Sequence, residues 1–471
     1  MYRKKVHLHF VGIGGIGMSG IAKILRYQGY TISGCDNDLD QQSVYDLQAL
    51  GCSIYQGNNT ELCKDHSIDV LVYSSAINAH NDEIIAAQAR NIPTIPRALM
   101  LAELMRTKYS IAIAGSHGKT TTTSLIAHIL IEAKKDPTVI IGGRLKTIST
   151  NAQFGLGDFL VAEADESDRS LVHLQATLAV VTNINLEHLD TYSDIEDIKN
   201  TFKQFLNNLP FYGTAIVCID NVHVRSILPL THIKTIKYGF EDWADIYADE
   251  VVLNSDHSIF TVYQKNIKMG VVTTHMPGRH NVLNSLAAIA LALELEISFE
   301  IIQQALNSFK GIERRFSYNG LYKGAEIFDD YGHHPEEIRN TIAVAAKRKK
   351  KKLTVVFEPH RYTRTDKLWD LFLDTFMDFC IDNLIVTDIY PASEQPIDNI
   401  TSERFACELK KRNPPFNVLY VPYDNDFIAI KKSLDDLINA DDLVLLQGAG
   451  KINKLVQKLT NKNNESLTVI L

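Results

Sequence analysis

The sequence predicts an α/β protein of three domains, each built around a mainly parallel β-sheet. Short apolar segments of strand length alternate with helical patterns along the whole chain, and no internal repeat or low-complexity linker interrupts them. The length of 471 residues also corresponds to about three domains at roughly 150 residues each. We expect these domains to span residues 1–106, 107–312 and 313–471.

The first domain has the order of elements that produces a Rossmann-like sheet. A buried strand is expected at 6–11, followed by a glycine-rich turn and a helix to about residue 27. Further strands are expected at 31–35 and 69–75, and a helix at 97–107 leads to the second domain. Strands that alternate with helices in this way pair in parallel.

The turn of the first domain matches the dinucleotide-binding fingerprint, with Gly12, Gly14 and Gly17 in place and Asp36 about 20 residues further on. The glycines indicate that a diphosphate approaches the start of a helix. A nicotinamide cofactor and a UDP-sugar both carry a diphosphate, and a tight turn without a ligand is a third interpretation. Nicotinamide chemistry is disfavoured because no hydride-transfer constellation follows and a second phosphate loop does.

The second domain begins with that loop, which predicts the α/β architecture of P-loop ATPases. The apolar strand 111–113 leads into a Gly-x-x-Gly-Lys-Thr turn formed by Gly115, Gly118, Lys119 and Thr120. The lysine is expected to reach the outer phosphates of ATP, and the threonine hydroxyl to hold Mg²⁺. The loop is shorter than the usual one, since Ile113 stands where a glycine is common. The alternative is a plain strand-to-helix turn.

Polar residues at two strand ends are expected to join this loop. The strand 159–162 ends at Glu163, and the strand 178–182 ends at Asn183, with His188 five residues on. Parallel strands bring these ends to one edge of the sheet. Glu163 and Thr120 fit Mg²⁺, a hard cation that prefers oxygen. Histidine is an unusual Mg²⁺ ligand, so His188 could act directly or through another ligand.

The rest of the second domain contains a strand at 215–218, a small antiparallel patch at 245–275 and a helix at 280–295. Asn281 and Asn284 near the start of that helix lie three residues apart, so their amides can face one adenine edge. Capping of the helix is the alternative role.

The third domain is expected to be Rossmann-like, with strands at 353–357, 384–388 and 443–446. Two clusters, at 329–335 and 359–365, close successive strands and are expected side by side. Arg361 and Arg364 in the second cluster are rigid forks suited to a carboxylate, which indicates an amino-acid site, although surface ion pairs are the alternative. Arg314 and Arg315 are expected to reach ATP phosphates, and 447–450 to be a structural turn.

Composition excludes several classes of partner. A net charge of −8 argues against nucleic acid, and the basic run 347–352 is interpreted as a solvated helix end, with an anion or RNA site as the alternative. No apolar stretch approaches about 20 residues, so no membrane insertion is expected. The start of the chain runs directly into a strand, which predicts a cytoplasmic protein without a signal peptide. Reduced, structural thiols are expected at the scattered cysteines, Cys35, Cys52, Cys63, Cys218, Cys380 and Cys407.

Taken together, five segments resemble those of the Mur ligases of peptidoglycan synthesis. They are the segments 11–20, 115–123, 163–168, 329–335 and 360–365, and the resemblance runs essentially from end to end. The shortened phosphate loop is itself a mark of this family. Two minor departures are Ser116, where threonine is more usual, and Glu313, where glycine is common.

The resemblance implies an ATP-dependent ligase that uses Mg²⁺ or Mn²⁺. The branch it is most similar to joins L-alanine to the lactyl carboxylate of UDP-N-acetylmuramate through an acyl phosphate. Sister ligases commonly carry a modified lysine after the acidic cluster, and no lysine occurs at 167–174, which favours this branch. A recycling ligase that adds a whole tripeptide and a non-catalytic nucleotide-binding regulator are the alternatives. The oligomeric state is not predicted.

The resemblance also implies roles for individual residues. Catalysis is expected from Lys119, Glu163, His188 and His333, with metal on Thr120, Glu163 and His188. The UDP-sugar is expected at Gly12, Gly14, Gly15, Gly17, Asp36, Ser74 and Asn183. The amino acid is expected at Tyr331, His333, Arg361 and Arg364. ATP is expected at Gly115, Ser116, His117, Gly118, Lys119, Thr120, Thr121, Asn281, Asn284, Arg315 and Asp330.

Overall fold

The structure is a computed structural model that describes residues 6–57, 65, 67–74, 77–78, 80–145, 150–188, 191–230, 232–392, 394–424 and 426–460. The expected leaderless start, Cys63 and the end of the expected strand at Ser75 lie outside these residues. The chain forms two compact units, one of 1–252, 259–275 and 279–310, the other of 253–258, 276–278 and 311–471.

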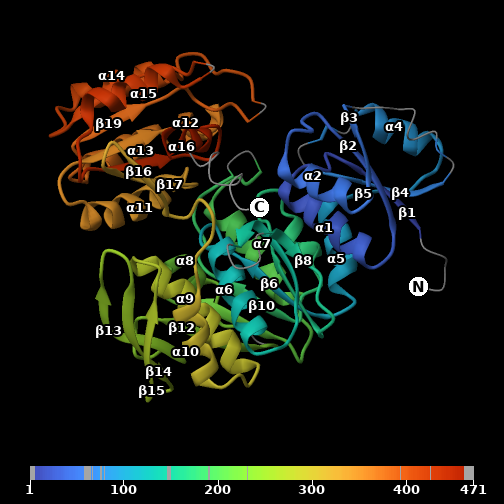
Figure 1. Cartoon of the computed structure of the whole chain (residues 1–471). Helices are drawn as coiled ribbons and strands as arrows, with labels where there is room; N and C mark the ends of the chain where they lie inside the picture. The colour runs from blue at the N-terminus through green and yellow to red at the C-terminus, as the bar shows by residue number, and fades with distance from the viewer. Residues whose placement is uncertain are drawn as a thin grey trace, which may run out of the picture. The chain divides into compact units, whose positions relative to one another are not determined.

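The first sheet confirms the Rossmann-like prediction. Its strands all run in parallel in the order β3-β2-β1-β4-β5, with α1 and α2 following β1 and β2 (Figure 1, blue). Strand β1 is buried over Leu8–Val11 and leads directly into the glycine turn. The elements are β1 His7–Val11, α1 Ile16–Tyr27, β2 Thr31–Asp36, α2 Gln42–Ala49, β3 Ser53–Gln56, β4 Ile68–Tyr73, α4 Asp82–Ala89, β5 Thr94–Pro96 and α5 Arg97–Met105.

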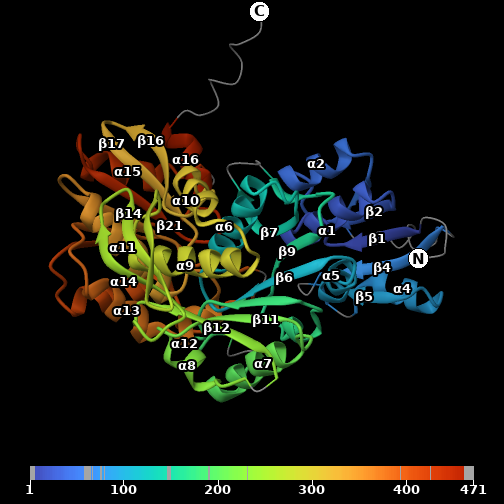
Figure 2. The ribbon, with the colours of Figure 1, turned by 90° about the horizontal axis from the view of Figure 1, so that it is seen from below.

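The second sheet has ten strands in the order β15-β14-β13-β12-β11-β10-β6-β9-β7-β8. Figure 2 shows its strands β11 and β12 between a layer that contains α6 and α9 and a layer that contains α7 and α8. Its first elements are β6 Tyr109–Ala114, α6 Lys119–Glu132, β7 Thr138–Leu145, β8 Thr150–Gln153, β9 Phe159–Glu163, the 3₁₀ turn Ser170–His173, β10 Leu178–Val181, α7 Ile195–Asn207, β11 Thr214–Cys218 and α8 Val222–Ser226.

The expected β patch at 245–275 continues this sheet beyond β12. The two residues between β14 and β15, Lys265 and Asn266, both have positive φ, as a tight hairpin turn requires, so these two strands are antiparallel. The elements here are β12 Lys234–Gly239, β13 Ile246–Leu253, β14 Ser258–Gln264, β15 Ile267–Thr274, α9 Arg279–Glu294 and α10 Phe299–Ser308.

The third sheet has the order β16-β17-β21-β18-β19-β20 and is parallel except for β16. Helix α11 begins at Pro335, where the missing N–H is tolerated, and a capping box formed by His334 and Glu337 closes its first turn. Its elements are β16 Ser317–Tyr322, β17 Ala325–Asp330, α11 Pro335–Arg348, β18 Leu353–Phe357, α12 Tyr362–Lys367, α13 Trp369–Met377, β19 Asn383–Val386, α14 Ser402–Lys411, β20 Asn417–Tyr420, α15 Ile428–Leu437, β21 Leu443–Gln447 and α16 Asn453–Thr460.

The order of this sheet corrects one expectation. The clusters after β17 and β18 do not close neighbouring strands, because the last strand, β21, pairs with both and lies between them. The two clusters nevertheless lie side by side as expected, since the rings of His333 and His360 are 5.4 Å apart. The basic run after α11 forms ion pairs: Arg348 with Glu326, Lys349 with Asp382 and Lys351 with Asp441. These pairs agree with the solvated helix end.

Two further observations concern the chain as a whole. Among the helices that the structure describes, none combines the length and the apolar character needed to cross a membrane. The five described cysteines are free thiols, of which Cys35, Cys52 and Cys218 are buried and Cys380 and Cys407 are exposed.

Candidate active site

The loop after β6 needs its two glycines. Gly115 has φ +138°, and a Cβ there would lie 2.0 Å from the Thr182 hydroxyl oxygen. Gly118 has φ +82°, and a Cβ there would lie 2.5 Å from Oδ1 of Asn284. Both positions therefore exclude a side chain by conformation and by contact. The loop contacts the end of β10 and helix α9 at these two glycines. Because neither position carries a side chain, the backbone of the loop can curve around a ligand.

The neighbouring strand end holds the loop in place. The Asn183 side chain accepts a hydrogen bond from the His117 N–H at 2.8 Å and donates one to the His117 carbonyl at 3.0 Å. The Thr182 hydroxyl donates to the same carbonyl at 2.6 Å. The Ser116 hydroxyl accepts from the Asn185 N–H at 2.9 Å. Asn183, expected at the UDP-sugar, thus contacts the phosphate loop, and its expected role stays a prediction.

The Lys119 ammonium is the cation of the loop, and carboxylate and carbonyl oxygens lie around it. Its Nζ is 2.8 Å from both carboxylate oxygens of Glu166 and 2.5 Å from the Gly115 carbonyl. Burial lowers the pKa of Lys119, but the charges of Glu166 and Asp165 outweigh it and hold the pKa above its usual value. The lysine is therefore a cation at neutral pH. Sequence reasoning noted Glu166 in the acidic run but did not assign it a role.

Thr120 and Glu163 meet, as the sequence predicts. The Thr120 hydroxyl donates to Oε2 of Glu163 at 3.3 Å, and the Gly142 N–H donates to Oε1 at 2.7 Å. The pairing of β6 with β9 places Glu163 beside Ile113, just before the loop. A hydroxyl and a carboxylate at this separation form the oxygen donor set that Mg²⁺ prefers.

His188 lies next to a different carboxylate. Its Nε2 is 3.4 Å from Glu166 and 3.6 Å from Glu187, and donor atoms of these three residues lie within 4.8 Å of one another. Glu187 is also 3.3 Å from Nε2 of His117. His188 thus belongs to a donor set that includes Glu166 and Glu187, two residues that sequence reasoning left unassigned.

Asn281 and Asn284 lie inside α9, which begins at Arg279, so neither caps the helix. Asn284 is buried; its Oδ1 accepts from the Thr122 hydroxyl at 3.3 Å, and its amide donates to Asn281 at 3.2 Å. The hydrogen bond between Thr122 and Asn284 holds α9 against α6 beside the loop. Contact of either amide with adenine stays a prediction.

The Gly12 turn is braced by side chains of the same sheet. The Gly14 N–H donates to Asp36 at 2.8 Å, and the Ser43 hydroxyl donates to the Gly14 carbonyl at 2.6 Å. A Cβ on Gly12 would lie 3.3 Å from Cβ of Ser74, so Ser74 does reach the turn. Asp36 orients the turn itself in this arrangement.

One arginine that sequence reasoning missed links this turn to the acidic run. A Cβ on Gly17 would lie 3.3 Å from the Arg97 side chain, which forms a 3.1 Å ion pair with Asp165. The start of α1 is also tied to β8, because the Asn151 amide donates to the Ile16 carbonyl at 2.7 Å. A cation therefore stands over the glycine turn, where a diphosphate is expected.

The C-terminal sheet carries the expected histidine and arginine cluster. The rings of His333 and His360 are 5.4 Å apart, and Tyr390 stacks on His360 at 5.4 Å. The Arg364 guanidinium lies 3.2 Å from Nδ1 of His360. Burial and the charges of His333 and Arg364 lower the pKa of His360 to about 2, so the neutral ring can accept from Arg364. Arg361 lies 3.7 Å from Glu394.

Asp330 is the centre of a structural network. It accepts hydrogen bonds from the Phe316 N–H, the Gly332 N–H, the Thr341 hydroxyl and the Gln447 amide. These bonds occupy both carboxylate oxygens, and its expected contact with ATP stays a prediction. In the turn after β21, the Gly448 carbonyl accepts a hydrogen bond from Arg314 at 2.6 Å, and its purely structural role stays a prediction.

Arg315 and Tyr331 lie together beside the same strand end. The Arg315 guanidinium is 5.5 Å from the centre of the Tyr331 ring and 3.7 Å from Glu337, and the Arg314 guanidinium lies 4.9 Å from the same ring. Tyr331 in turn meets His333 edge to face at 5.4 Å. Two expected amino-acid contacts therefore pack together with an arginine expected at ATP.

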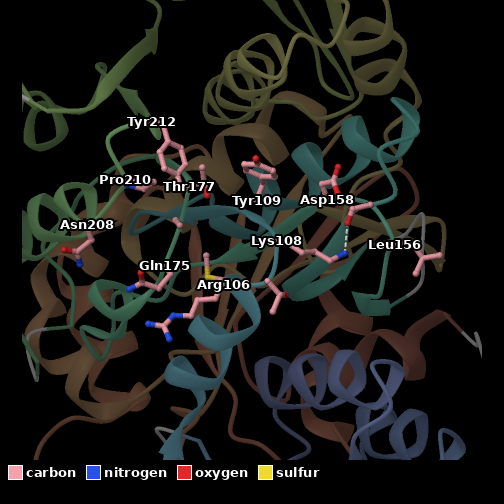
Figure 3. Close-up of a pocket in the computed structure, with 14 residues that line it drawn as sticks. Arg106, Lys108, Tyr109, Leu156, Asp158, Gln175, Thr177, Asn208, Pro210 and Tyr212 are labelled. Atoms are coloured by element: carbon pink, nitrogen blue, oxygen red, sulfur yellow. Dashed lines mark hydrogen bonds between the residues drawn. The ribbon is translucent and has the colours of Figure 1, made fainter. Parts of the chain in front are cut away.

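A hollow of about 670 Å³ lies away from these groups (Figure 3). Its lining includes Tyr109 at the start of β6, Asp158 just before β9 and Thr177 just before β10. Because these strands are parallel, the hollow lies at the edge of the sheet opposite the phosphate loop. None of the expected site residues lines it.

Comparisons with known proteins identify the family of the chain. Models of the Mur ligase family, catalytic domain, the Mur ligase middle domain and the Mur ligase, glutamate ligase domain match residues 7–109, 113–292 and 314–450. A UDP-N-acetylmuramate–L-alanine ligase of Geotalea daltonii is 48% identical over 470 residues, which cover 99% of this chain and 100% of that protein.

Two solved structures share the fold. A UDP-N-acetylmuramate-alanine ligase from Thermotoga maritima matches with a TM-score of 0.80 and 24% identity over 98% of this chain and 99% of the other. A murein peptide ligase from Psychrobacter arcticus matches with a TM-score of 0.72 and 22% identity over 97% and 98%. With three family models along its length and a relative of nearly half identity, the chain belongs to the Mur ligase family.

Proposed function

We propose that this protein joins L-alanine to the lactyl carboxylate of UDP-N-acetylmuramate and converts ATP to ADP and phosphate. The observation that carries the proposal is the phosphate loop, in which Lys119 stands next to the Thr120–Glu163 pair. The substrates follow from the name of the Geotalea daltonii relative, which is similar along its whole length. We place the reaction in the cytoplasm, because ATP is available there.

The first step transfers the γ-phosphoryl group. The lactyl carboxylate oxygen attacks the γ-phosphorus, an O–P bond forms, the bond to the β-phosphate oxygen breaks, and ADP leaves with the electron pair. Negative charge spreads over the transferred oxygens in this step. Lys119 and the N–H groups of the loop stabilise that charge, because they are fixed before the substrate arrives. Asn183 and Thr182 keep the loop in that shape.

Thr120 and Glu163 fit Mg²⁺, since the hydroxyl and the carboxylate already face one another at 3.3 Å. When bound, the ion neutralises charge on the phosphates. Glu166, Glu187 and His188 form a donor set for a second divalent ion. A mixed nitrogen and oxygen set also accepts Mn²⁺.

The second step forms the amide. The alanine amine attacks the acyl carbonyl, a C–N bond forms, the C–O bond to phosphate breaks, phosphate leaves with the electron pair, and the amine proton passes to solvent. We assign Arg361 and Arg364 to the alanine carboxylate, because two guanidinium forks suit a planar anion. We assign His333 to the amine. Its ring is held between Tyr331 and His360, which fixes its direction.

The UDP diphosphate is assigned to the turn from Gly12 to Gly17. The start of α1 provides free N–H groups, and Arg97 stands over Gly17. Asp36 and Ser74 shape the turn from either side.

The alternatives differ in the second substrate. Phosphate release by the purified protein with ATP, Mg²⁺ and UDP-N-acetylmuramate should require L-alanine. Turnover with L-alanyl-γ-D-glutamyl-meso-diaminopimelate alone would place the chain with the recycling ligases. Binding of the UDP-sugar without any turnover would support the regulator.

A further inference from the structure

A group of side chains in the core of the first sheet has no part in the proposed reaction. His9 lies on β1, Cys35 on the neighbouring strand β2 and Glu83 in the first turn of α4. One donor atom of each residue lies within 4.8 Å of the donor atoms of the other two. His9 and Glu83 are 0% exposed, and Cys35 is 1% exposed.

The register of the strands explains how these residues meet. His9 pairs with Ser33, and Val11 pairs with Cys35, so His9 and Cys35 lie two positions apart on the same face of the sheet. Helix α4 covers that face, because Cys35 and Val11 share an apolar cluster with Ile84. The three donor atoms therefore converge inside an apolar layer, where a polar group destabilises the fold unless it has a partner.

The His9 ring is oriented like that of a metal ligand. Its Nδ1 lies 2.8 Å from the Ser33 hydroxyl, which is itself 2.7 Å from Nε2 of His7. The other nitrogen, Nε2, is buried without a hydrogen-bond partner. It points to Glu83 at 3.9 Å, which is too long for a hydrogen bond. Ligating imidazoles are commonly fixed in this way, with one nitrogen held by an outer partner and the other directed at the ion.

We propose that His9, Cys35 and Glu83 bind a zinc ion in the core of the first sheet. Thiolate, imidazole and carboxylate are the three donor types that zinc takes in proteins, at about 2.0 to 2.3 Å. A tetrahedral ion at such distances holds its donors about 3.3 to 3.8 Å apart, close to the 3.9 Å between His9 and Glu83. A water completes the fourth position. The thiol and the imidazole bind in their deprotonated forms, so binding releases the thiol proton to solvent.

The ion would brace the glycine turn of the first domain. The Cys35 carbonyl accepts hydrogen bonds from the Gly12 N–H at 2.9 Å and from the Ile13 N–H at 3.1 Å. A metal that fixes the Cys35 side chain would therefore also fix the residue that anchors the turn. This role is structural and does not depend on the proposed function.

Metal content tests the proposal on the full-length protein. We expect about one zinc ion per chain, measured by mass spectrometry after expression in zinc-supplemented medium and dialysis against a weak chelator. Refolding with Co²⁺ in place of zinc should give a thiolate-to-cobalt band in the near ultraviolet, because Cys35 supplies sulfur. Excess Mg²⁺ in both experiments keeps the oxygen site near Glu163 occupied.

Two substitutions assign the ion. Cys35→Ser should remove the cobalt band and reduce zinc to near zero. The matched control is Cys52→Ser, which alters another buried thiol of the same unit outside the cluster and should keep both. If Cys35→Ser does not fold, the zinc content of Glu83→Gln and the cobalt spectrum of the unaltered protein test the proposal in its place. A metal-free protein without the band, or equal zinc in Cys35→Ser and Cys52→Ser, would overturn the proposal.

Discussion

Charged side chains gather at the carboxyl edges of both the central and the C-terminal sheet. The two edges differ in how closely these charges are paired and in how far burial shifts their pKa values. At the central edge, opposite charges are in contact: Lys119 with Glu166 at 2.8 Å and Arg97 with Asp165 at 3.1 Å. At the C-terminal edge, opposite charges lie further apart, Arg315 from Glu337 and Arg361 from Glu394 both at 3.7 Å, and burial shifts other titratable groups toward their neutral forms. It raises the pKa of Asp329 to about 6, and it lowers that of His360 to about 2.

This difference separates two ways of preparing a site. The central edge keeps full charges in ion pairs, and we propose that a bound phosphate replaces the internal carboxylate partner of Lys119. The C-terminal edge keeps its carboxylates and histidine in fixed hydrogen-bonded positions: Glu358, for example, accepts from the Gly450 N–H, the Lys451 N–H and the Tyr423 hydroxyl. The first arrangement suits transfer of a phosphoryl group, and the second suits orientation of a small zwitterion.

Replacement of Lys119 should have the largest effect. Lys119→Ala removes the cation that we propose to face the transferred phosphoryl group, and we expect phosphate release to fall by about 10³-fold or more. Binding of UDP-N-acetylmuramate, followed by thermal shift, should remain, because the Gly12 turn is built from other residues. Lys135→Ala, an exposed lysine beyond the other end of α6, is the control. Retained turnover in Lys119→Ala would falsify the phosphate-loop assignment.

Glu166→Gln tests the internal pairing at the central edge. Loss of one partner of a buried ion pair destabilises a protein by about 3 kcal/mol, and we expect that loss in the free energy of unfolding of the nucleotide-free protein. Saturating ATP should reduce the difference in the free energy of unfolding between Glu166→Gln and the unaltered protein, because phosphate oxygens replace the lost carboxylate. Glu196→Gln, which breaks an exposed pair with Lys199, should change stability by less than about 1 kcal/mol. An equal deficit with and without ATP would mean that Glu166 acts on the fold alone.

The fold was predictable because its signals are local. Apolar strand segments, the glycine turns and the polar residues directly after strands define the three sheets and the two loops. Glu163 and Thr120 meet as expected, since neighbouring parallel strands bring their ends together. The late strand β21 was identified, but its insertion between β17 and β18 was not, because strand order depends on packing between segments far apart in the chain.

The partners within the site were less accessible from sequence. Glu166 and Asp165 lie in one acidic run, and their spacing does not say which of them reaches Lys119 and which reaches Arg97. The place of Asn183 at a strand end was read from the sequence, and its expected UDP-sugar role came from the resemblance, whereas its contact with His117 depends on how the loop folds back. Contacts of this kind depend on side-chain direction, which an irregular segment does not reveal.

Asp329→Asn tests the neutral character of the C-terminal edge. Burial favours the protonated form, so the folded protein binds more protons than the unfolded chain between about pH 4 and pH 6. The stability that this group contributes is therefore lost as the pH rises through that window. We expect Asp329→Asn to gain about 2 kcal/mol over the unaltered protein between pH 4.5 and pH 7.5, measured by denaturant unfolding. If the difference in the free energy of unfolding between the two proteins were the same at every pH in this range, Asp329 would be ionised over the whole range, as a partner of Arg314.

Arg364→Ala should have the smallest effect, and it tests whether the C-terminal edge orients the amino acid. The guanidinium donates to the neutral ring of His360 and to its carbonyl, both at 3.2 Å, which fixes its position at the end of β18. We expect the KM for L-alanine to rise about 10-fold while kcat changes less, because the contact serves binding more than the chemical step. Arg404→Ala, on the exposed face of α14, is the control. A fall in kcat at constant KM would instead mean that Arg364 stabilises charge during amide formation, and the two edges would then share a role that we propose for the central sheet alone.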